Sequence, residues 1–400
     1  AAGQDPAAQE PPLFLIERIV VEGLERNSAR EIVISESRLR AGTSYSEAQL
    51  REAIYRVKRL LWVVDADMSL RKGSTRGAYE LAIVVEGAKP VAFAVDFGGI
   101  YSVPDAEEDD GGYDGLDIDA AITVSGRKFI GSRGLLFGSA QEFAGDFGFV
   151  QLGYTRYGLF GGGSSATVAL GRAAGDGVAD NLQAAAQLDV PVTGNHVVRV
   201  FAGWAISEDR FTLLDGSSET RSEAWRAHLE WIYDTTDDPL FATTGRSVVT
   251  TARYESFRQR IRTHFDFLEG PVDVDDRFDD SSWTVGTQGR QFWPITLKQS
   301  LGIGAGASHG ESGGFASSFT TATVEAVHAF NVWDYVVRER HGDLRLETRA
   351  LIGASRSTSK PLDFERSQIE GRLQTSLLFR NAWGVFRFTF TYYDILAGDR

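Results

Sequence analysis

The sequence predicts a mainly β protein in which a transmembrane antiparallel barrel of about sixteen strands follows one small α+β domain. Beyond residue 90, the chain is a succession of segments of ~9 to 12 residues in which every second residue is apolar, as in membrane-spanning strands. Mean hydropathy is -0.18, and no run of ~18 apolar residues predicts a helical span. The front of the chain shows the order strand, helix, helix, strand, strand.

Composition divides the chain into three parts. Residues 1–13 begin with AAGQDPAAQEPP, a small, polar and Pro-bearing stretch typical of a flexible lead left after removal of a signal peptide. Residues 14–89 hold the small domain, and residues 90–400 hold the barrel. The absence of Cys is compatible with an oxidising compartment, without disulfides.

The small domain begins with a short strand. The stretch from Ile16 to Val21 is largely apolar and ends at Gly23, a breaker. A first helix is expected to follow, because Ser28 can cap a helical segment that runs through Ile34.

A second helix is predicted from a capping box, in which Ser46 and Gln49 bond each other's main chain. Its apolar residues recur at helical spacing: Leu50, Ile54, Val57 and Leu61. The segments Trp62–Leu70 and Tyr79–Glu86 then alternate like a two-stranded hairpin, joined by the turn Lys72–Thr75. The expected order is therefore β-α-α-β-β.

The segments beyond this domain alternate over their whole length. In Trp225–Tyr233, Leu344–Ile352 and Phe386–Tyr392, aromatic and aliphatic residues alternate with charged or hydroxyl residues. One side of each strand is thus suited to lipid and the other to a wet lumen. A soluble sandwich also alternates, but its strands are usually only ~5 or 6 residues long. Strand length therefore favours the barrel.

The β-α-α-β-β order over residues 14–89 resembles a POTRA domain, the periplasmic module of outer-membrane assembly and secretion barrels. In that family, the exposed strand edge of the domain accepts an extended client or partner segment. The alternative is that the unit is only a plug or spacer beneath the barrel.

A second resemblance lies in the segment Tyr233–Arg246. Its residues Asp234, Asp237, Pro239 and Gly245 resemble the strand-turn-strand signature of the bacterial surface antigen superfamily, which includes BamA, TamA and two-partner secretion transporters. Asp can bond its own main chain two residues on, Pro presets φ and Gly allows positive φ, so a tight turn between neighbouring strands is expected.

The resemblance implies a Gram-negative outer-membrane protein whose POTRA domain lies in the periplasm. It implies capture of an unfolded or extended outer-membrane or secreted polypeptide, and its insertion into or translocation across the membrane. Periplasmic or lipoprotein subunits and the lipid bilayer are the implied partners. Neither a cofactor nor a catalytic site is implied.

The sequence departs from the family at one functional motif. Active members carry a Val-Arg-Gly-Phe type tetrapeptide on a loop inside the lumen, and no such tetrapeptide occurs between His309 and Asp343. Alternating strands can still direct charges into the lumen, and the candidates for a substitute charge pair are Arg338, Glu347, Arg349 and Glu370. Two alternatives stay open: these residues are ordinary lumen lining, or the chain is a degenerate member that serves as a non-transporting scaffold or accessory subunit.

Other chemistries find little support in the sequence. Gly310–Gly314 matches the nucleophile elbow of serine hydrolases and adjoins His309, but an elbow needs a strand, a turn and then a helix. The six His show no paired metal spacing, and the acidic run Asp273–Asp280 lacks the Gly and Glu of an EF-hand, which favours a solvated loop over a calcium site. A net charge of -14 argues against nucleic acid.

Overall fold

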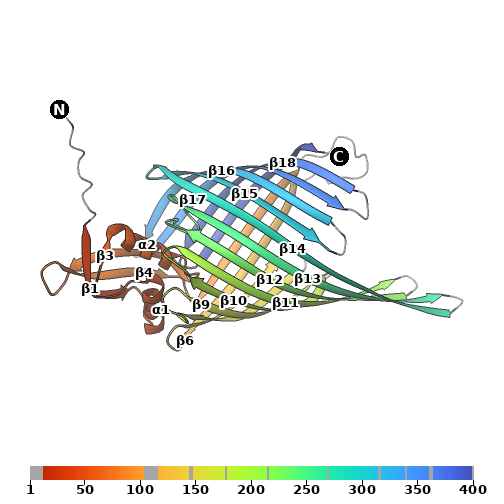
Figure 1. Cartoon of the computed structure of the whole chain (residues 1–400), viewed down its shortest axis with the longest axis horizontal. Helices are drawn as coiled ribbons and strands as arrows, with labels where there is room; N and C mark the ends of the chain where they lie inside the picture. The colour runs from red at the N-terminus through yellow and green to blue at the C-terminus, as the bar shows by residue number, and fades with distance from the viewer. Residues whose placement is uncertain are drawn as a thin grey trace.

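The computed structural model describes residues 12–102, 116–143, 147–175, 178–213, 216–267, 270–313, 317–337, 340–359 and 364–398. It consists of a small α+β domain followed by a closed β-barrel (Figure 1). Over these ranges, neither of the helices has the length and apolar character needed to cross a bilayer.

The N-terminal domain is a four-stranded sheet with two helices packed against it. The strand order is β2-β1-β4-β3, with β1 antiparallel to β2 and parallel to β4. The predicted order lacked β2. This strand is a four-residue polar segment without the apolar run that would predict a strand, and it forms by pairing with β1. The elements are β1 (Leu13–Glu22), α1 (Asn27–Ser37), β2 (Thr43–Ser46), α2 (Glu47–Lys58), β3 (Val63–Lys72) and β4 (Ala78–Gly87).

The two predicted helix caps had different outcomes. The Ser46 hydroxyl accepts the Gln49 N–H at 3.3 Å and the Gln49 side chain accepts the Ser46 N–H at 2.9 Å, so the capping box is confirmed. The predicted cap at Ser28 is wrong, because α1 begins at Asn27, two residues earlier than such a cap requires, and Arg26 is its N-cap without a side-chain bond. Leu61 was expected on the buried face of α2, but it lies beyond the helix and is 95% exposed, while Leu60 is buried.

This difference between the caps gives a first prediction. We expect Ser46→Ala to lower the free energy of unfolding of the domain by about 1 kcal/mol, because an orphan N–H at the start of α2 loses its acceptor. Ser28→Ala is the matched control and is expected to be nearly neutral, since Ser28 lies inside α1. Hydrogen exchange of the α2 amides in the full chain measures both. Equal effects of the two substitutions would contradict the assignment.

The core of this domain lies between the sheet and the helices. Ile32 of α1 and Leu50 and Val57 of α2 are fully buried, as are Leu81 and Ile83 of β4. Three barrel residues, namely Phe129, Leu135 and Tyr157, belong to or pack against the same cluster. The domain therefore shares its core with one end of the barrel, which we call the base.

Fifteen strands form the closed barrel, one fewer than the approximate count from the sequence. Because strand directions alternate, an odd number leaves the first and last strands parallel, so β19 and β5 close the barrel with Gly384 opposite Phe93 and Tyr393 opposite Ser102. The expectation of a wholly antiparallel sheet is wrong at this seam alone. The strands are β5 (Val91–Ser102), β6 (Leu116–Ile130), β7 (Gly134–Phe143), β8 (Phe147–Tyr157), β9 (Ser165–Gly175), β10 (Val178–Pro191), β11 (His196–Leu213), β12 (Gly216–Asp234), β13 (Gly245–Phe267), β14 (Gly270–Thr296), β15 (Gln299–Ser312), β16 (Ser317–Val337), β17 (Arg340–Ser359), β18 (Phe364–Asn381) and β19 (Gly384–Gly398).

The outer wall of the barrel is apolar and bounded by aromatic side chains. Leu229, Leu373 and Phe390 are about half exposed and belong to the faces that the sequence assigned to lipid. On β14 the exposed Trp283 and Trp293 are ten residues apart. With a rise of ~3.4 Å per residue and a tilt of ~40°, they are about 25 Å apart along the barrel axis, the height of the apolar band in outer-membrane barrels. The barrel is therefore of the membrane-spanning kind.

Candidate functional site at the base of the barrel lumen

The segment between β12 and β13, residues 235–244, holds the predicted turn signature, and we call it the lumen loop. Asp234 Oδ1 accepts the Thr236 N–H at 2.8 Å, and Asp237 Oδ1 accepts the Thr243 N–H at 2.8 Å. Gly245 has a φ of 99°, and a Cβ there would lie 2.3 Å from the Thr235 carbonyl oxygen. Asp234 therefore bonds the main chain two residues on and Gly245 has positive φ, as expected, whereas Asp237 bonds the main chain six residues on. The segment is a ten-residue loop that enters the lumen and not a tight turn.

A buried ion pair holds the lumen loop against the barrel wall. Arg380 of β18 donates to Asp238 Oδ1 at 3.0 Å and to Asp343 of β17 at 2.7 Å, and its guanidinium also lies 2.9 Å from Asp238 Oδ2. Asp238 and Arg380 are each only 7% exposed. The Phe241 ring lies beneath the Arg380 guanidinium, 4.4 Å from its centroid. The loop thus crosses from β12 and β13 to strands several places around the barrel.

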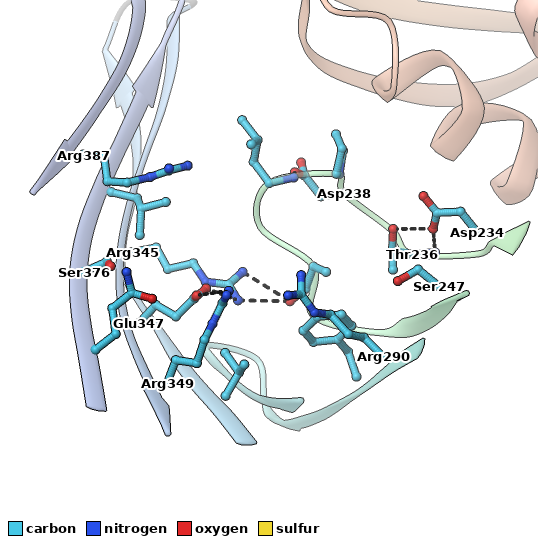
Figure 2. Close-up of a pocket in the computed structure, with 17 residues that line it drawn as sticks. Asp234, Thr236, Asp238, Ser247, Arg290, Arg345, Glu347, Arg349, Ser376 and Arg387 are labelled. Atoms are coloured by element: carbon cyan, nitrogen blue, oxygen red, sulfur yellow. Dashed lines mark hydrogen bonds and ion pairs between the residues drawn. The ribbon is translucent and has the colours of Figure 1, made fainter. Parts of the chain in front are cut away.

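A second arginine fixes the tip of the lumen loop. Arg345 of β17 is 1% exposed, and both of its terminal nitrogens donate to the Ala242 carbonyl oxygen at 3.2 Å. Glu347 lies 3.4 Å from the Arg345 guanidinium and balances its charge. Figure 2 shows Arg345, Glu347 and Arg349 directed from the wall toward the loop. Because a buried cation without partners would be costly, these contacts keep the loop in one position.

A cavity of about 360 Å³ lies between the lumen loop and the wall. Arg349 donates to Glu347 at 3.1 Å and lies 3.8 Å from Glu325, a 5% exposed carboxylate that also pairs with Arg290. Charged and polar side chains from the wall strands β13, β14, β17, β18 and β19 therefore line this space beside the loop (Figure 2). The lining includes Asp234, Asp238, Arg290, Arg345, Glu347, Arg349, Gln374, Ser376 and Arg387.

The four predicted lumen charges do not form one group. Glu347 and Arg349 are paired within the cavity lining, as described above. Glu370 lies opposite Gly353 on the neighbouring strand, four positions away from Arg349, and accepts the Tyr393 hydroxyl at 2.9 Å. Arg338 lies outside the described residues. Three residues of the site were not predicted from the sequence: Arg345, Arg380 and Asp238. The only sequence signal for the two arginines is their place in an alternating strand, and the only one for Asp238 is its position next to the signature residue Asp237.

The N-terminal domain contacts the lumen loop directly. Arg59, the C-cap of α2, lies 2.9 Å from the Asp234 carboxylate and donates to the Thr236 carbonyl oxygen at 3.0 Å. On the other side of the loop, Lys58 pairs with Asp65 at 2.7 Å and lines a cavity of about 280 Å³ shared with Asp238. The signature residue Asp234 therefore joins the domain to the loop.

Three other contacts dock the domain on the base. Trp62 packs edge-on against Phe129, with ring centroids 5.0 Å apart. The Lys89 N–H donates to the Ala382 carbonyl oxygen at 2.7 Å. Arg56, 9% exposed, donates to Asn195 at 3.2 Å. Burial, and next the charge of neighbouring Arg38, lowers the pKa of Arg56 to about 10, so it stays a cation at neutral pH.

The elbow-like sequence does not form a hydrolase site. Ser312 ends β15 in a strand and not at a strand-helix turn, and its hydroxyl donates to Asp280 at 2.7 Å. His309 bonds Thr320 instead, and its odd position places it on the other face of β15 from Ser312. Among the described residues, no group of three His, Asp or Glu is placed to hold a metal ion.

The fold is similar to those of several solved structures. No family model and no curated protein matches the sequence. BamA from Haemophilus ducreyi lacking POTRA domains 1-3 is similar in structure, with 12% identity, a TM-score of 0.42 and coverage of 96% of this chain and 84% of that chain. CdiB from Acinetobacter baumannii has 10% identity, a TM-score of 0.40 and coverage of 92% and 68%. The siderophore receptor PiuA from Acinetobacter baumannii has 11% identity, a TM-score of 0.36 and coverage of 91% and 69%. Identities and scores this low do not assign an activity.

Proposed function

We propose that the chain is an outer-membrane protein of the BamA-type surface antigen superfamily that mediates insertion or translocation of polypeptides. In this proposal residues 14–89 are a periplasmic POTRA domain and residues 90–400 are the barrel. The observation that supports it best is the lumen loop, because one segment contacts both the domain, through Arg59, and the barrel wall, through Arg380.

Such a loop can couple client capture to access through the barrel. The sheet order leaves β2 and β3 at its two edges, and an extended polypeptide can add a strand to such an edge. Strain applied there reaches α2, whose C-cap Arg59 binds the lumen loop. Movement of the loop away from Arg345 and Arg380 would then open the base of the lumen to the client.

We propose that the charged residues around the lumen loop replace the missing Val-Arg-Gly-Phe type tetrapeptide. These residues are Asp238, Arg345, Glu347, Arg349 and Arg380. Here the loop carries the carboxylate, Asp238, and the wall carries the arginine, Arg380, whereas the family tetrapeptide places its arginine on the loop. The pair Glu347 and Arg349 supports Arg345, since Glu347 contacts both arginines. Glu370 lies too far along β18 to take part and is assigned to ordinary lumen lining.

A non-transporting scaffold is the second candidate. The observation that favours it is the burial of the Asp238–Arg380 pair, since a loop held this firmly also suits a barrel that stays closed. In that case periplasmic or lipoprotein subunits bind the domain, and the barrel only anchors them.

A covalent latch distinguishes the two candidates. The chain has no Cys, so Asp238→Cys with Arg380→Cys gives a unique pair that a bifunctional maleimide can join in native membranes. If the chain transports or inserts polypeptides, the joined protein loses assembly of outer-membrane clients, while the unjoined variant and each single variant treated with the reagent retain it. Unchanged client levels together with intact partner association would support the scaffold and contradict the proposed function.

A further inference from the structure

Strands β11 to β14 extend beyond the rest of the barrel on the side away from the N-terminal domain (Figure 1). β14 pairs with β15 only from Ser282 onward, but it pairs with β13 as far as Gly270. The hairpin of β15 and β16 ends at Ser312 and Ser317, at the level of Ser282. Residues 270–281 of β14 therefore have a partner strand on one side alone within the described part of the chain.

This extension lies in water and not in the bilayer. Below it, the outward face carries the exposed aromatics Trp225, Tyr254 and Trp283. Above them, the same face is charged on three adjacent strands, with Arg221, Glu223, Arg258, Arg260, Asp275 and Asp279. A change from aromatic to charged residues marks the surface of the membrane.

The edge of β14 that points away from β13 carries the main-chain groups of Asp273, Asp275, Arg277 and Asp279, which pair with no second strand among the described residues. The Ser281 carbonyl oxygen accepts the Gly313 N–H at 2.8 Å, so odd-numbered residues direct their main-chain groups away from β13. By this alternation Asp273, Asp275, Arg277 and Asp279 offer N–H and C=O groups at the edge. Pro271 has the same parity, which suits a residue that lacks an N–H. The edge is about 40 Å long, at ~3.4 Å per residue.

We propose that residues 270–281 of β14 bind an extended segment of another protein that carries basic residues, which adds as a strand at this edge. The segment holds five Asp and one Arg, a charge of -4 from five negative and one positive residue. Its face with Asp273, Asp275 and Asp279 favours basic side chains on the partner strand. Its opposite face exposes Val272 and Val274, at 46% and 38%, and also carries Asp276 and Asp280, so it suits a partner strand on which apolar and basic side chains share a face.

Asp273, Asp275 and Asp279 each contact one cationic or His side chain of β13 and can still accept a hydrogen bond from a second cation. His264 contacts Asp273 at 2.6 Å, Arg260 contacts Asp275 at 2.7 Å and Arg258 contacts Asp279 at 3.0 Å, all from β13. An ionised carboxylate has about four acceptor positions, so a cation from the free side can also bind. A second copy of this chain fits poorly, because two edges of charge -4 would lie side by side.

A substitution pair at one position tests this proposal in the full chain, purified in detergent micelles. Arg277→Pro removes an edge N–H without breaking the β13 ladder, while Arg277→Ala removes the same positive charge and keeps that N–H. The probe is a fluorescent twelve-residue peptide of alternating lysine and threonine, and its control has glutamate for lysine. Heat-modified gel migration checks that both variants fold.

We expect wild type and Arg277→Ala to bind the lysine peptide in a salt-sensitive manner and to ignore the glutamate peptide. Arg277→Pro should weaken binding about tenfold, the effect of losing one or two main-chain hydrogen bonds at ~1 kcal/mol each. Equal binding by the two variants would mean attraction by charge without strand addition, and would overturn the proposal. The proposal would also be overturned if the lysine peptide did not bind to wild type. It would likewise be overturned if two copies of the chain associated through this edge and Arg277→Pro abolished that association.

Discussion

Replacing Asp238 by alanine is expected to release the lumen loop and raise the ion conductance of the barrel in planar bilayers. The substitution leaves the 7% exposed Arg380 without its bidentate partner, although Asp343 remains 2.7 Å away. Breaking a buried pair by removing one member usually costs about 3–5 kcal/mol, and the single retained contact places the expected loss at the lower end, about 3 kcal/mol. Urea unfolding of the purified barrel measures the loss of stability.

Two controls separate the loop from general effects of charge. Arg380→Ala should act like Asp238→Ala. Arg372 lies on the same face of β18, but it is half exposed and its contact with Glu370 is long, at 3.8 Å, so Arg372→Ala should leave conductance unchanged. The exchange Asp238→Arg with Arg380→Asp restores opposite charges and should recover part of the stability. If Asp238→Ala conducted no more than wild type, the loop would not be the element that closes the base.

Replacing Trp62 by alanine is expected to undock the N-terminal domain from the base. Trp62 is 2% exposed, belongs to the core that the domain shares with the barrel, and packs on Phe129 of β6. Truncation of a buried Trp costs about 3–5 kcal/mol through lost burial and the cavity it leaves. Limited proteolysis near Lys89 and hydrogen exchange of β1 to β4 report the undocking.

The adjacent residue provides the control for this experiment. Leu61→Ala changes a side chain that is 95% exposed, so the proteolysis pattern should match that of wild type. Because Arg59 precedes Trp62 on the same segment, undocking should also weaken the Arg59 contact with Asp234 and raise conductance slightly. Protection of residues 88–90 equal to wild type in Trp62→Ala would contradict a docking role for this side chain.

The sequence was sufficient for features that depend on local pattern. Alternation predicted which face of each strand meets lipid, as Trp225 and Leu373 confirm, and the capping box at Ser46 predicted the start of α2. These predictions succeed because neighbours along the chain determine them. The hairpin of β3 and β4 was found for the same reason.

Features that depend on distant residues could not be predicted. Asp238 lies beside the signature residue Asp237, and only the position of Arg380 on β18 distinguishes their roles. The short strand β2 exists through its pairing with β1. Leu60 and Leu61 are equally apolar, and the last turn of α2 decides which of them is buried. The parallel pairing of β5 with β19 follows from the odd number of strands, and alternation along the sequence gives that number only approximately.

That seam has a topological consequence. In a barrel with an even number of strands, the first strand begins and the last strand ends on the same side of the bilayer. Here β5 begins at Val91 beside the N-terminal domain, while β19 runs in the same direction and ends at Gly398 on the opposite side (Figure 1). The polypeptide therefore makes a net crossing of the membrane, and an epitope placed after Gly398 would face the compartment that the N-terminal domain never enters.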